Sequence, residues 1–114
     1  MTRIDVAQGV STRAVILGPY TWSGGTADPL FPGLSKFFAV RILRPVNGVP
    51  QILQALTVTA VASQHEGIQA VGVTDLSVIT ETDGHIGVNF NVANLHGFNT
   101  LYEFSYYFSM IVPE

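Results

Sequence analysis

Residues 101–112 read LYEFSYYFSMIV, and this stretch decides the fold. Every second residue from Tyr102 to Val112 is aromatic or aliphatic, whereas the residues between them are mostly polar. A period of two is that of a β-strand, because helical spacing would mix Glu103 and the two serines into the apolar stripe. A strand with one apolar and one polar face is typical of an antiparallel sheet. We therefore predict a strand over Leu101–Val112 that turns Tyr102 toward the core and Leu101 away from it.

Five further segments with strand character, separated by turns, precede this stretch. They are Val10–Gly18, Phe37–Leu43, Ile52–Val61, Ile68–Ile79 and Ile86–Val92. Asn47-Gly48 and Asp83-Gly84 are dipeptides typical of tight turns. The alternation of Ile68–Ile79 slips near Asp75, which predicts a β-bulge there. The whole chain, residues 1–114, is thus expected to form one all-β domain, a single antiparallel β-sandwich of about six strands.

For two of these strands and one of the connections, the sequence predicts further details. The first strand is predicted to end at Gly18-Pro19, with Val15 and Leu17 on one face. Its other face is expected to carry Arg13, Ala14 and Ile16. Both faces of Ile52–Val61 are apolar, which predicts a central strand or one that meets a partner. Tyr20–Gly33, which holds the only Trp, is predicted to be a long loop.

The composition excludes several classes of protein. Lys and Arg total 5 against 8 Asp and Glu, so the net charge of −3 argues against nucleic-acid binding. The chain has no cysteine and hence no disulfide or thiolate site. No segment has the length and apolarity of a membrane helix, and residues 1–10 lack a signal-peptide pattern. A soluble protein without membrane insertion is therefore expected.

Charged residues make up only 11% of the chain, against about 25% in ordinary domains. One interpretation is a surface covered by neutral polar residues. The other is that part of the surface is buried in a homo-oligomer, where charge is depleted. In the second case, Leu53→Lys should split the oligomer if the outward face of Ile52–Val61 is an interface.

The sequence contains no nucleophile elbow, P-loop, HExxH or CxxC pattern, so we expect a protein that is not an enzyme. His65, His85 and His96 lie in or beside predicted turns and could bind a metal with Asp83 or Glu81, or be ordinary surface residues. Glu81 and Asp83 could likewise act as acid and base, or be solvated turn residues. No metal or cofactor is expected.

A binding module is better supported by the residues. Neutral sugars need amide, carboxylate and imidazole hydrogen bonds together with an aromatic ring. Such groups occur in two of the connections: Tyr20, Trp22 and Asp28 in the long loop over Tyr20–Gly33, and Asn94, His96 and Asn99 in the loop over Ala93–Thr100. The alternatives are that Trp22 plugs the sandwich and that the asparagines and His96 only shape their loop.

Residues 37–112 resemble the H-type lectin domain, a small six-stranded antiparallel sandwich, in the order and character of their segments. The corresponding stretches are RPVNGVPQILQALTV, SQHEGIQAV, DLSVITETDG, HIGVNFNVANLHGFN and YEFSYYFSMIV. The resemblance implies trimers or hexamers that bind galactose or N-acetylgalactosamine between protomers. The family's Trp-His pair would fall at Ala93–His96, with His96 as counterpart of the His, Asn94 as a possible substitute and the Trp absent.

The resemblance also assigns two positions outside this loop. The family's arginine would fall near Gln69, and its acidic contact has Asp28 as a candidate. The expected function is therefore a non-catalytic, oligomeric lectin for carbohydrates or glycoconjugates, with Trp22 and Asn99 as further contacts. The rival is a structural or attachment module, such as the trimeric β domain of a virion or tail fibre. A metal-dependent enzyme ranks third.

Overall fold

The structure is a computed structural model, and it describes residues 11–63 and 67–114. These residues form six strands in two antiparallel three-stranded sheets, which confirms the expected all-β fold. One sheet has the order β1-β6-β3, with β1 at Thr12–Ser23, β3 at Ala55–Ala62 and β6 at Glu103–Pro113. The other has the order β2-β5-β4, with β2 at Ser35–Leu43, β4 at Val71–Thr80 and β5 at Ile86–Asn94.

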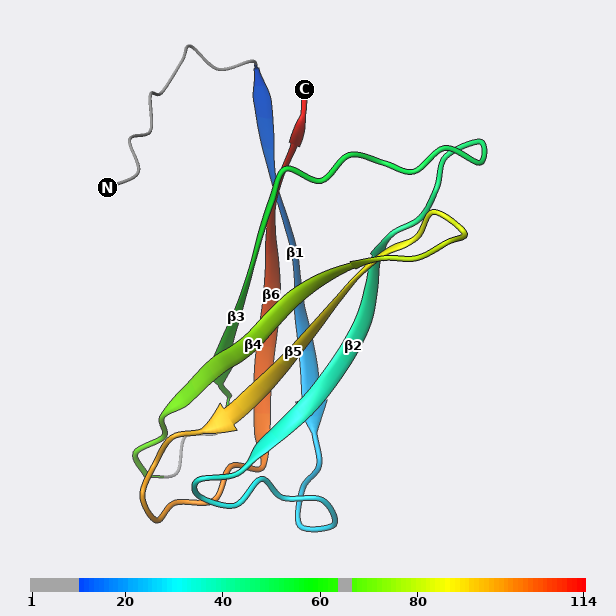
Figure 1. Cartoon of the computed structure of the whole chain (residues 1–114). Helices are drawn as coiled ribbons and strands as arrows, with labels where there is room; N and C mark the ends of the chain where they lie inside the picture. Colours follow the sequence, from blue (N-terminus) through cyan, green and yellow to red (C-terminus); the bar gives the residue numbers. More distant parts are fainter. Residues whose placement is uncertain (1–10, 64–66) are drawn as a thin grey trace, which may run out of the picture.

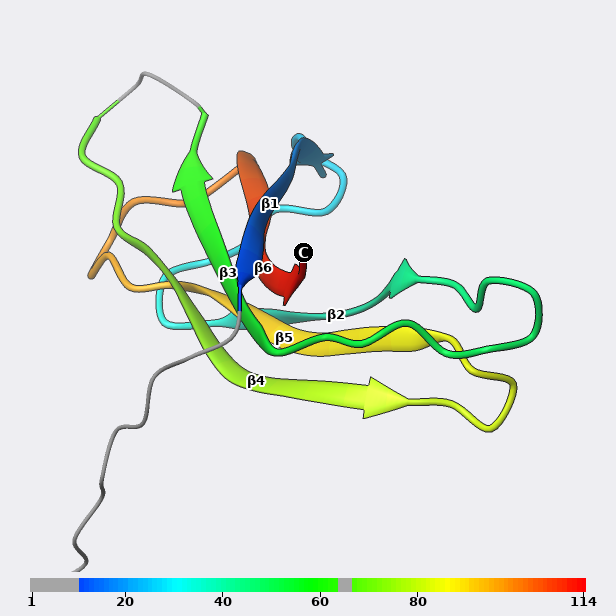
Figure 2. The ribbon, with the colours of Figure 1, turned by 90° about the horizontal axis from the view of Figure 1, so that it is seen from above.

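The two sheets lie face to face as the layers of a sandwich (Figures 1 and 2). The chain changes sheet at every connection except the one between β4 and β5, which are antiparallel neighbours. The connections therefore gather at the two ends of the sandwich. One end carries the chain between β2 and β3 and the turn between β4 and β5, and the other carries the remaining three connections (Figure 1).

The core is built by the two strands that lie in the middle of their sheets. From β5 it takes Val88, Phe90 and Val92, and from β6 it takes Phe104 and Phe108, all at most 1% exposed. Their alternation in the sequence predicted this orientation, which the structure confirms. Ahead of β6 the alternation fails, because Leu101 bridges to Leu30 and is buried, while Tyr102 is 41% exposed.

The prediction that the first strand ends at Gly18-Pro19 was wrong. β1 continues to Ser23, and Gly18-Pro19 forms a bulge between Leu17 and Tyr20. At Gly18, φ is 126° and a Cβ would lie 2.9 Å from the carbonyl oxygen of Tyr106, so only glycine fits. The bulge changes which residues of the strand face inward. Tyr20 packs on Tyr106 and Trp22 on Phe104, so both belong to the strand and not to a loop.

The same register corrects the place of Arg13. It pairs with Val112 and shares the inner face with Val15 and Leu17, whereas Ala14 and Ile16 face outward. Cross-strand partners in an antiparallel pair lie on one face of the sheet, so this placement follows directly from the pairing. The prediction that put Arg13 with Ala14 and Ile16 was wrong because it broke the period of two.

Two other strands differ from their predictions in position. β3 begins at Ala55 and lies at the edge of its sheet, so it is not a central strand, and Leu53 precedes it. β4 begins at Val71, after the predicted start at Ile68. Its predicted bulge is confirmed, because the register shifts between Thr74 and Ser77 and Asp75 has a φ of 55°.

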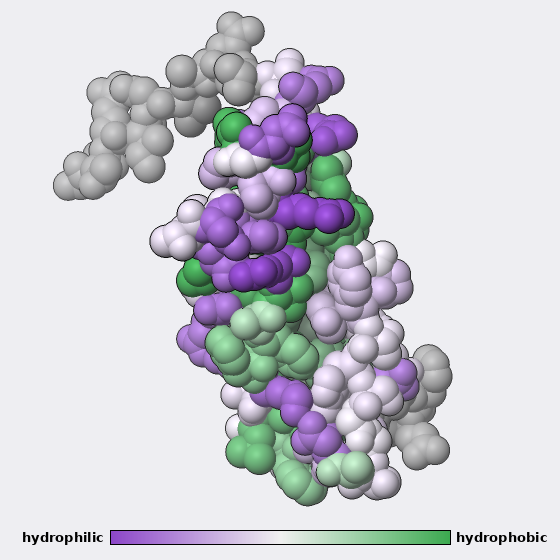
Figure 3. All heavy atoms as spheres, turned by 90° about the vertical axis from the view of Figure 1, so that its right-hand side faces the viewer, coloured by the Kyte–Doolittle hydropathy of each residue, from purple (hydrophilic) through white to green (hydrophobic). Residues whose placement is uncertain are grey.

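The sandwich is closed along one side and open along the other. β3 packs against β4, whereas β1 and β2 on the opposite side are less closely apposed. Figure 3 looks onto the β2 side and shows hydrophobic residues reaching the surface between hydrophilic ones. None of the described residues form a helix that could span a membrane.

Candidate functional site

Three loops meet at the end of the sandwich that lies away from the C-terminus (Figure 1). They follow β1, β3 and β5, and backbone hydrogen bonds join them. Leu30 and Leu101 exchange two such bonds, Gly33 donates to the carbonyl of Asn94, and Leu95 donates to that of Ala70. The described residues of these loops are therefore joined to one another, and we call the surface that they form the loop end.

Asn94, the last residue of β5, holds the loop end together. It is 1% exposed, and its amide nitrogen donates to the carbonyls of Leu30 and Asn99 at 3.0 and 2.8 Å. Its amide oxygen accepts from the backbone N–H of His96 at 3.1 Å. All of these contacts are internal, so Asn94 shapes the loops from inside, and its burial argues against the predicted contact with a ligand.

His96 and Asn99 also hold the loop, but both reach its surface. Nδ1 of His96 accepts from the backbone N–H groups of Asn99 and Phe98 at 3.0 and 3.3 Å. A neutral ring with these bonds carries its proton on Nε2, which makes that nitrogen a donor. Asn99 donates from its side chain to the carbonyl of Ile68 at 2.7 Å, which ties this loop to residues 67–70. Gln69 lies in that segment and is half-buried.

A hollow of about 170 Å³ opens beside Trp22 at the same end. The Trp22 ring stacks on Phe104 with centroids 5.0 Å apart, and the Lys36 ammonium lies 5.3 Å from the centroid of the Trp22 ring. Lys36 donates to a carboxylate oxygen of Asp28 at 2.6 Å. The Asp28 side chain is 61% exposed, so most of its hydrogen-bonding capacity faces solvent. Aromatic surface, a carboxylate and an ammonium thus lie side by side.

The structure brings five of the six predicted site residues to the surface of the loop end. Trp22 and Asp28 line the hollow, His96, Asn99 and Gln69 lie on the neighbouring loops, and Asn94 is buried beneath them. Lys36 was missed by the sequence analysis. The sequence does single it out, since Lys36 occupies a core-facing position in the alternation that Phe38 and Val40 continue.

The structure does not bring together the two described histidines of the possible metal cluster that the sequence left open. His85 lies in the turn before β5 and His96 lies after it, so a strand of nine residues, roughly 30 Å long, separates them. His65 lies outside the described residues. Glu81, Asp83 and His85 do lie together, with potential ligand atoms within 4.8 Å of one another.

The groups of that turn are engaged with neighbouring side chains. Arg41 forms two contacts with Glu81, at 2.8 and 3.2 Å, and His85 Nδ1 lies 2.9 Å from Asp83. Hydrogen bonds from the backbone and then the side chain of His85 hold the pKa of Asp83 below its ordinary value of 3.8. Asp83 is therefore a permanent anion at neutral pH, and the arrangement resembles an ion-pair network more than a proton-sharing acid and base.

The chain was also compared with known proteins. A scan against models of protein families, a search of curated proteins and a search of solved structures found no match. The resemblance to the H-type lectin domain therefore rests on the order and character of its segments.

Proposed function

We propose that the protein is a non-catalytic carbohydrate-binding protein whose sugar site is the loop end. The observation that carries this proposal is the hollow in which Trp22, Asp28 and Lys36 meet. A sugar ring offers hydroxyl groups that both donate and accept, together with C–H faces that pack on aromatic surface. Asp28 accepts, Lys36 donates and Trp22 packs, so the three groups match all three properties.

The size of the hollow favours binding of a sugar between protomers. Its 170 Å³ is below the roughly 300–1,000 Å³ of ordinary ligand pockets, so one protomer encloses only an edge of a sugar ring. The remaining contacts would come from a neighbouring protomer in a trimer or hexamer. A weak single site repeated in an oligomer gains avidity from multivalency. Galactose-type sugars are the first ligands to test, because the resemblance implies them.

The test is a glycan array on the recombinant protein, with the mass in solution measured on the same preparation. We expect selective binding by an oligomer and loss of the signal in Asp28→Asn, which removes the exposed carboxylate. Asp75→Asn is the matched control: it removes the same charge at the bulge of β4, and asparagine tolerates the positive φ of that position. An empty array, or equal signals from the two variants, would refute the sugar site.

The second candidate is a structural or attachment module, and a different observation favours it. The outward face of the β1-β6-β3 sheet carries one charged residue, Glu103, among the described residues. Its exposed side chains include Ile16 and Val61, at 69% and 53%. A sheet face of this kind suits burial against another subunit. A very stable oligomer that binds no soluble sugar would favour this function over the lectin.

A further inference from the structure

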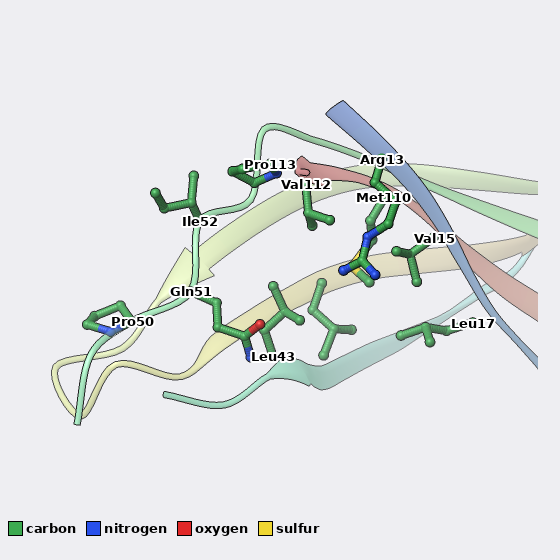
Figure 4. Close-up of a pocket in the computed structure, with 11 residues that line it drawn as sticks. Arg13, Val15, Leu17, Leu43, Pro50, Gln51, Ile52, Met110, Val112 and Pro113 are labelled. Atoms are coloured by element: carbon green, nitrogen blue, oxygen red, sulfur yellow. The ribbon is translucent and has the colours of Figure 1, made fainter. Parts of the chain in front are cut away.

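A second cavity lies between the sheets at the end opposite the loops. It has a volume of about 480 Å³ and opens along the side where β1 and β2 are apart. Figure 4 shows its walls. β1 and β6 form one wall, β2 forms the other, and residues 50–52 extend across the end. Most of the lining is aliphatic, including Val15, Leu17, Ile42, Met110 and Val112.

The cavity exists because the large aromatic side chains stop short of it. Phe104 and Phe108 of β6 fill the space between the sheets near the loop end and in the middle, together with Phe90 of β5. Beyond Phe108 the inward residues of β6 are Met110 and Val112, which are less bulky. The two sheets do not close over these shorter side chains, and an apolar space open to solvent remains.

One cation borders this apolar space, and it belongs to an exposed residue. Arg13 comes from the inner face of β1, and its guanidinium points toward Met110 (Figure 4). No ion pair or hydrogen bond of this guanidinium is found within residues 11–63 and 67–114. Gln51 brings a second polar group from the opposite side, held by a bond from its amide nitrogen to the carbonyl of Arg44 at 2.8 Å. Its amide oxygen remains an acceptor beside the cavity.

A lone guanidinium beside aliphatic walls defines the complementary ligand. Its body must be apolar, because most of the lining is aliphatic. Its head must be an anion, since a guanidinium presents a planar fork of donors that a carboxylate accepts in a bidentate way. At about 30 Å³ for each group of the size of water, 480 Å³ holds on the order of sixteen such groups. A chain of roughly ten to twelve carbons fits.

We propose that this cavity binds a medium-chain carboxylate, with its chain between the sheets and its head on Arg13. The proposal is independent of the sugar site, which lies at the other end of the sandwich. The ligand that fits is a free amphiphile and not a membrane surface, because the aliphatic residues face each other across the cavity. A bilayer could not enter this space without separating the sheets.

The direct test is binding of decanoate to the full chain by isothermal titration calorimetry, with decyltrimethylammonium as the cationic ligand of equal chain length. We expect one equivalent of decanoate to bind and the cation to bind at least about tenfold more weakly. Arg13→Gln should weaken decanoate binding by about tenfold to a hundredfold, the loss that follows from a charge-assisted hydrogen bond. Arg13→Lys keeps the charge and should recover part of the affinity.

Arg44→Gln is the matched control, since it removes the same charge from a residue that does not line the cavity. It should leave decanoate binding unchanged. The proposal is overturned by equal affinity for the anionic and cationic ligands, or by equal effects of Arg13→Gln and Arg44→Gln. Methyl NMR shifts on titration locate the ligand: we expect them at Val15 and Ile42 and not at Val61, and the reverse pattern would also overturn it.

A vesicle assay separates the free amphiphile from a lipid surface. The protein should not sediment with vesicles of phosphatidylcholine and phosphatidylglycerol in equal amounts. Sedimentation that is abolished by Arg13→Gln, without binding of decanoate, would replace the proposed ligand by an anionic membrane. Loss of sugar binding in Asp28→Asn has no bearing on these results, so the experiments test the two proposed sites independently.

Discussion

Asn94 is the residue on which the loop end depends most. Asn94→Ala removes three internal hydrogen bonds. The carbonyl of Asn99 and the backbone N–H of His96 lose this partner, whereas the carbonyl of Leu30 still accepts from the backbone N–H of Leu101. A buried group without a partner costs about 1–3 kcal/mol, so we expect a loss of roughly 2–4 kcal/mol in the free energy of unfolding, measured by urea denaturation. Asn91→Ala is the control, because Asn91 lies on the outer face of the same strand. A loss no larger than that of Asn91→Ala would contradict the internal role of Asn94.

Asp83 gives the stability a dependence on acid pH. Its folded pKa lies below the ordinary value of 3.8, so the folded state favours the charged form. The stabilisation is present above pH 3.8 and is lost as the pH falls through the folded pKa. We expect Asp83→Asn to flatten the fall in the urea midpoint between pH 5 and pH 2. A profile that keeps its full slope in Asp83→Asn would assign the acid transition to other carboxylates.

At the scale of the element, β6 joins the core to the candidate site. Phe104 is fully buried and carries the stacked ring of Trp22, so Phe104→Ala removes both core volume and the support of that ring. We expect a loss of about 3–5 kcal/mol by urea denaturation and a red shift of Trp22 emission as water reaches the indole. Phe98→Ala, at a residue 78% exposed, should change neither quantity appreciably. Unchanged emission in Phe104→Ala would show that the stacking does not shield Trp22.

The strands that could be predicted from the sequence are those whose alternation is strong. β5 and β6 lie in the middle of their sheets, so each has one face against the core, and their pattern is clear. The end of β1 could not be predicted, because the bulge between Leu17 and Tyr20 changes which alternate residues of the strand face the core. The pairing of Leu30 with Leu101 joins residues 71 positions apart, and no local pattern indicates such a contact.

The candidate site shows the same division. Trp22 and Asp28 could be named from the sequence as candidates because an aromatic residue and a carboxylate in one connection are typical of sugar sites. Lys36 was missed because it begins the next strand and meets them only in the folded chain. Arg13 was assigned to the wrong face, and with it the charge in the second cavity was overlooked. Side chains that meet across different strands can therefore be predicted only when the register of those strands is known. The sequence indicates this register only where the alternation of apolar and polar residues is unbroken.

At the scale of the whole molecule, the scarcity of charged residues is seen on the outward face of one sheet. Of the described residues on the outward face of the β1-β6-β3 sheet, only Glu103 is charged, and it lies at one end of the face. Along the middle of the face, Ala14, Ile16, Ala55 and Ile111 line a shallow apolar depression together with Ser109. This face is therefore almost uncharged, with apolar residues along the depression and Ser or Thr at many of the other positions.

This face is where we expect the protomers of an oligomer to meet. The position named from the sequence, Leu53, precedes β3 and does not lie in the strand whose outward face was to be tested, so the charge belongs at Ser109 in the middle of the face. Ser109→Lys would bury an unpaired ammonium in such an interface, at a cost of several kcal/mol, and should convert the oligomer to a monomer in light scattering.

Asn89→Lys is the control for this prediction, because it adds the same charge to the outward face of the other sheet. If it alone dissociates the oligomer, the protomers meet through the β2-β5-β4 sheet. A native protein that is already a monomer would contradict both the interface and the sharing of a sugar between protomers. The hollow of 170 Å³ would then be the entire sugar site, and only weak binding of a single ring edge could be expected. The oligomeric state therefore decides how much of the proposed lectin function the loop end can carry.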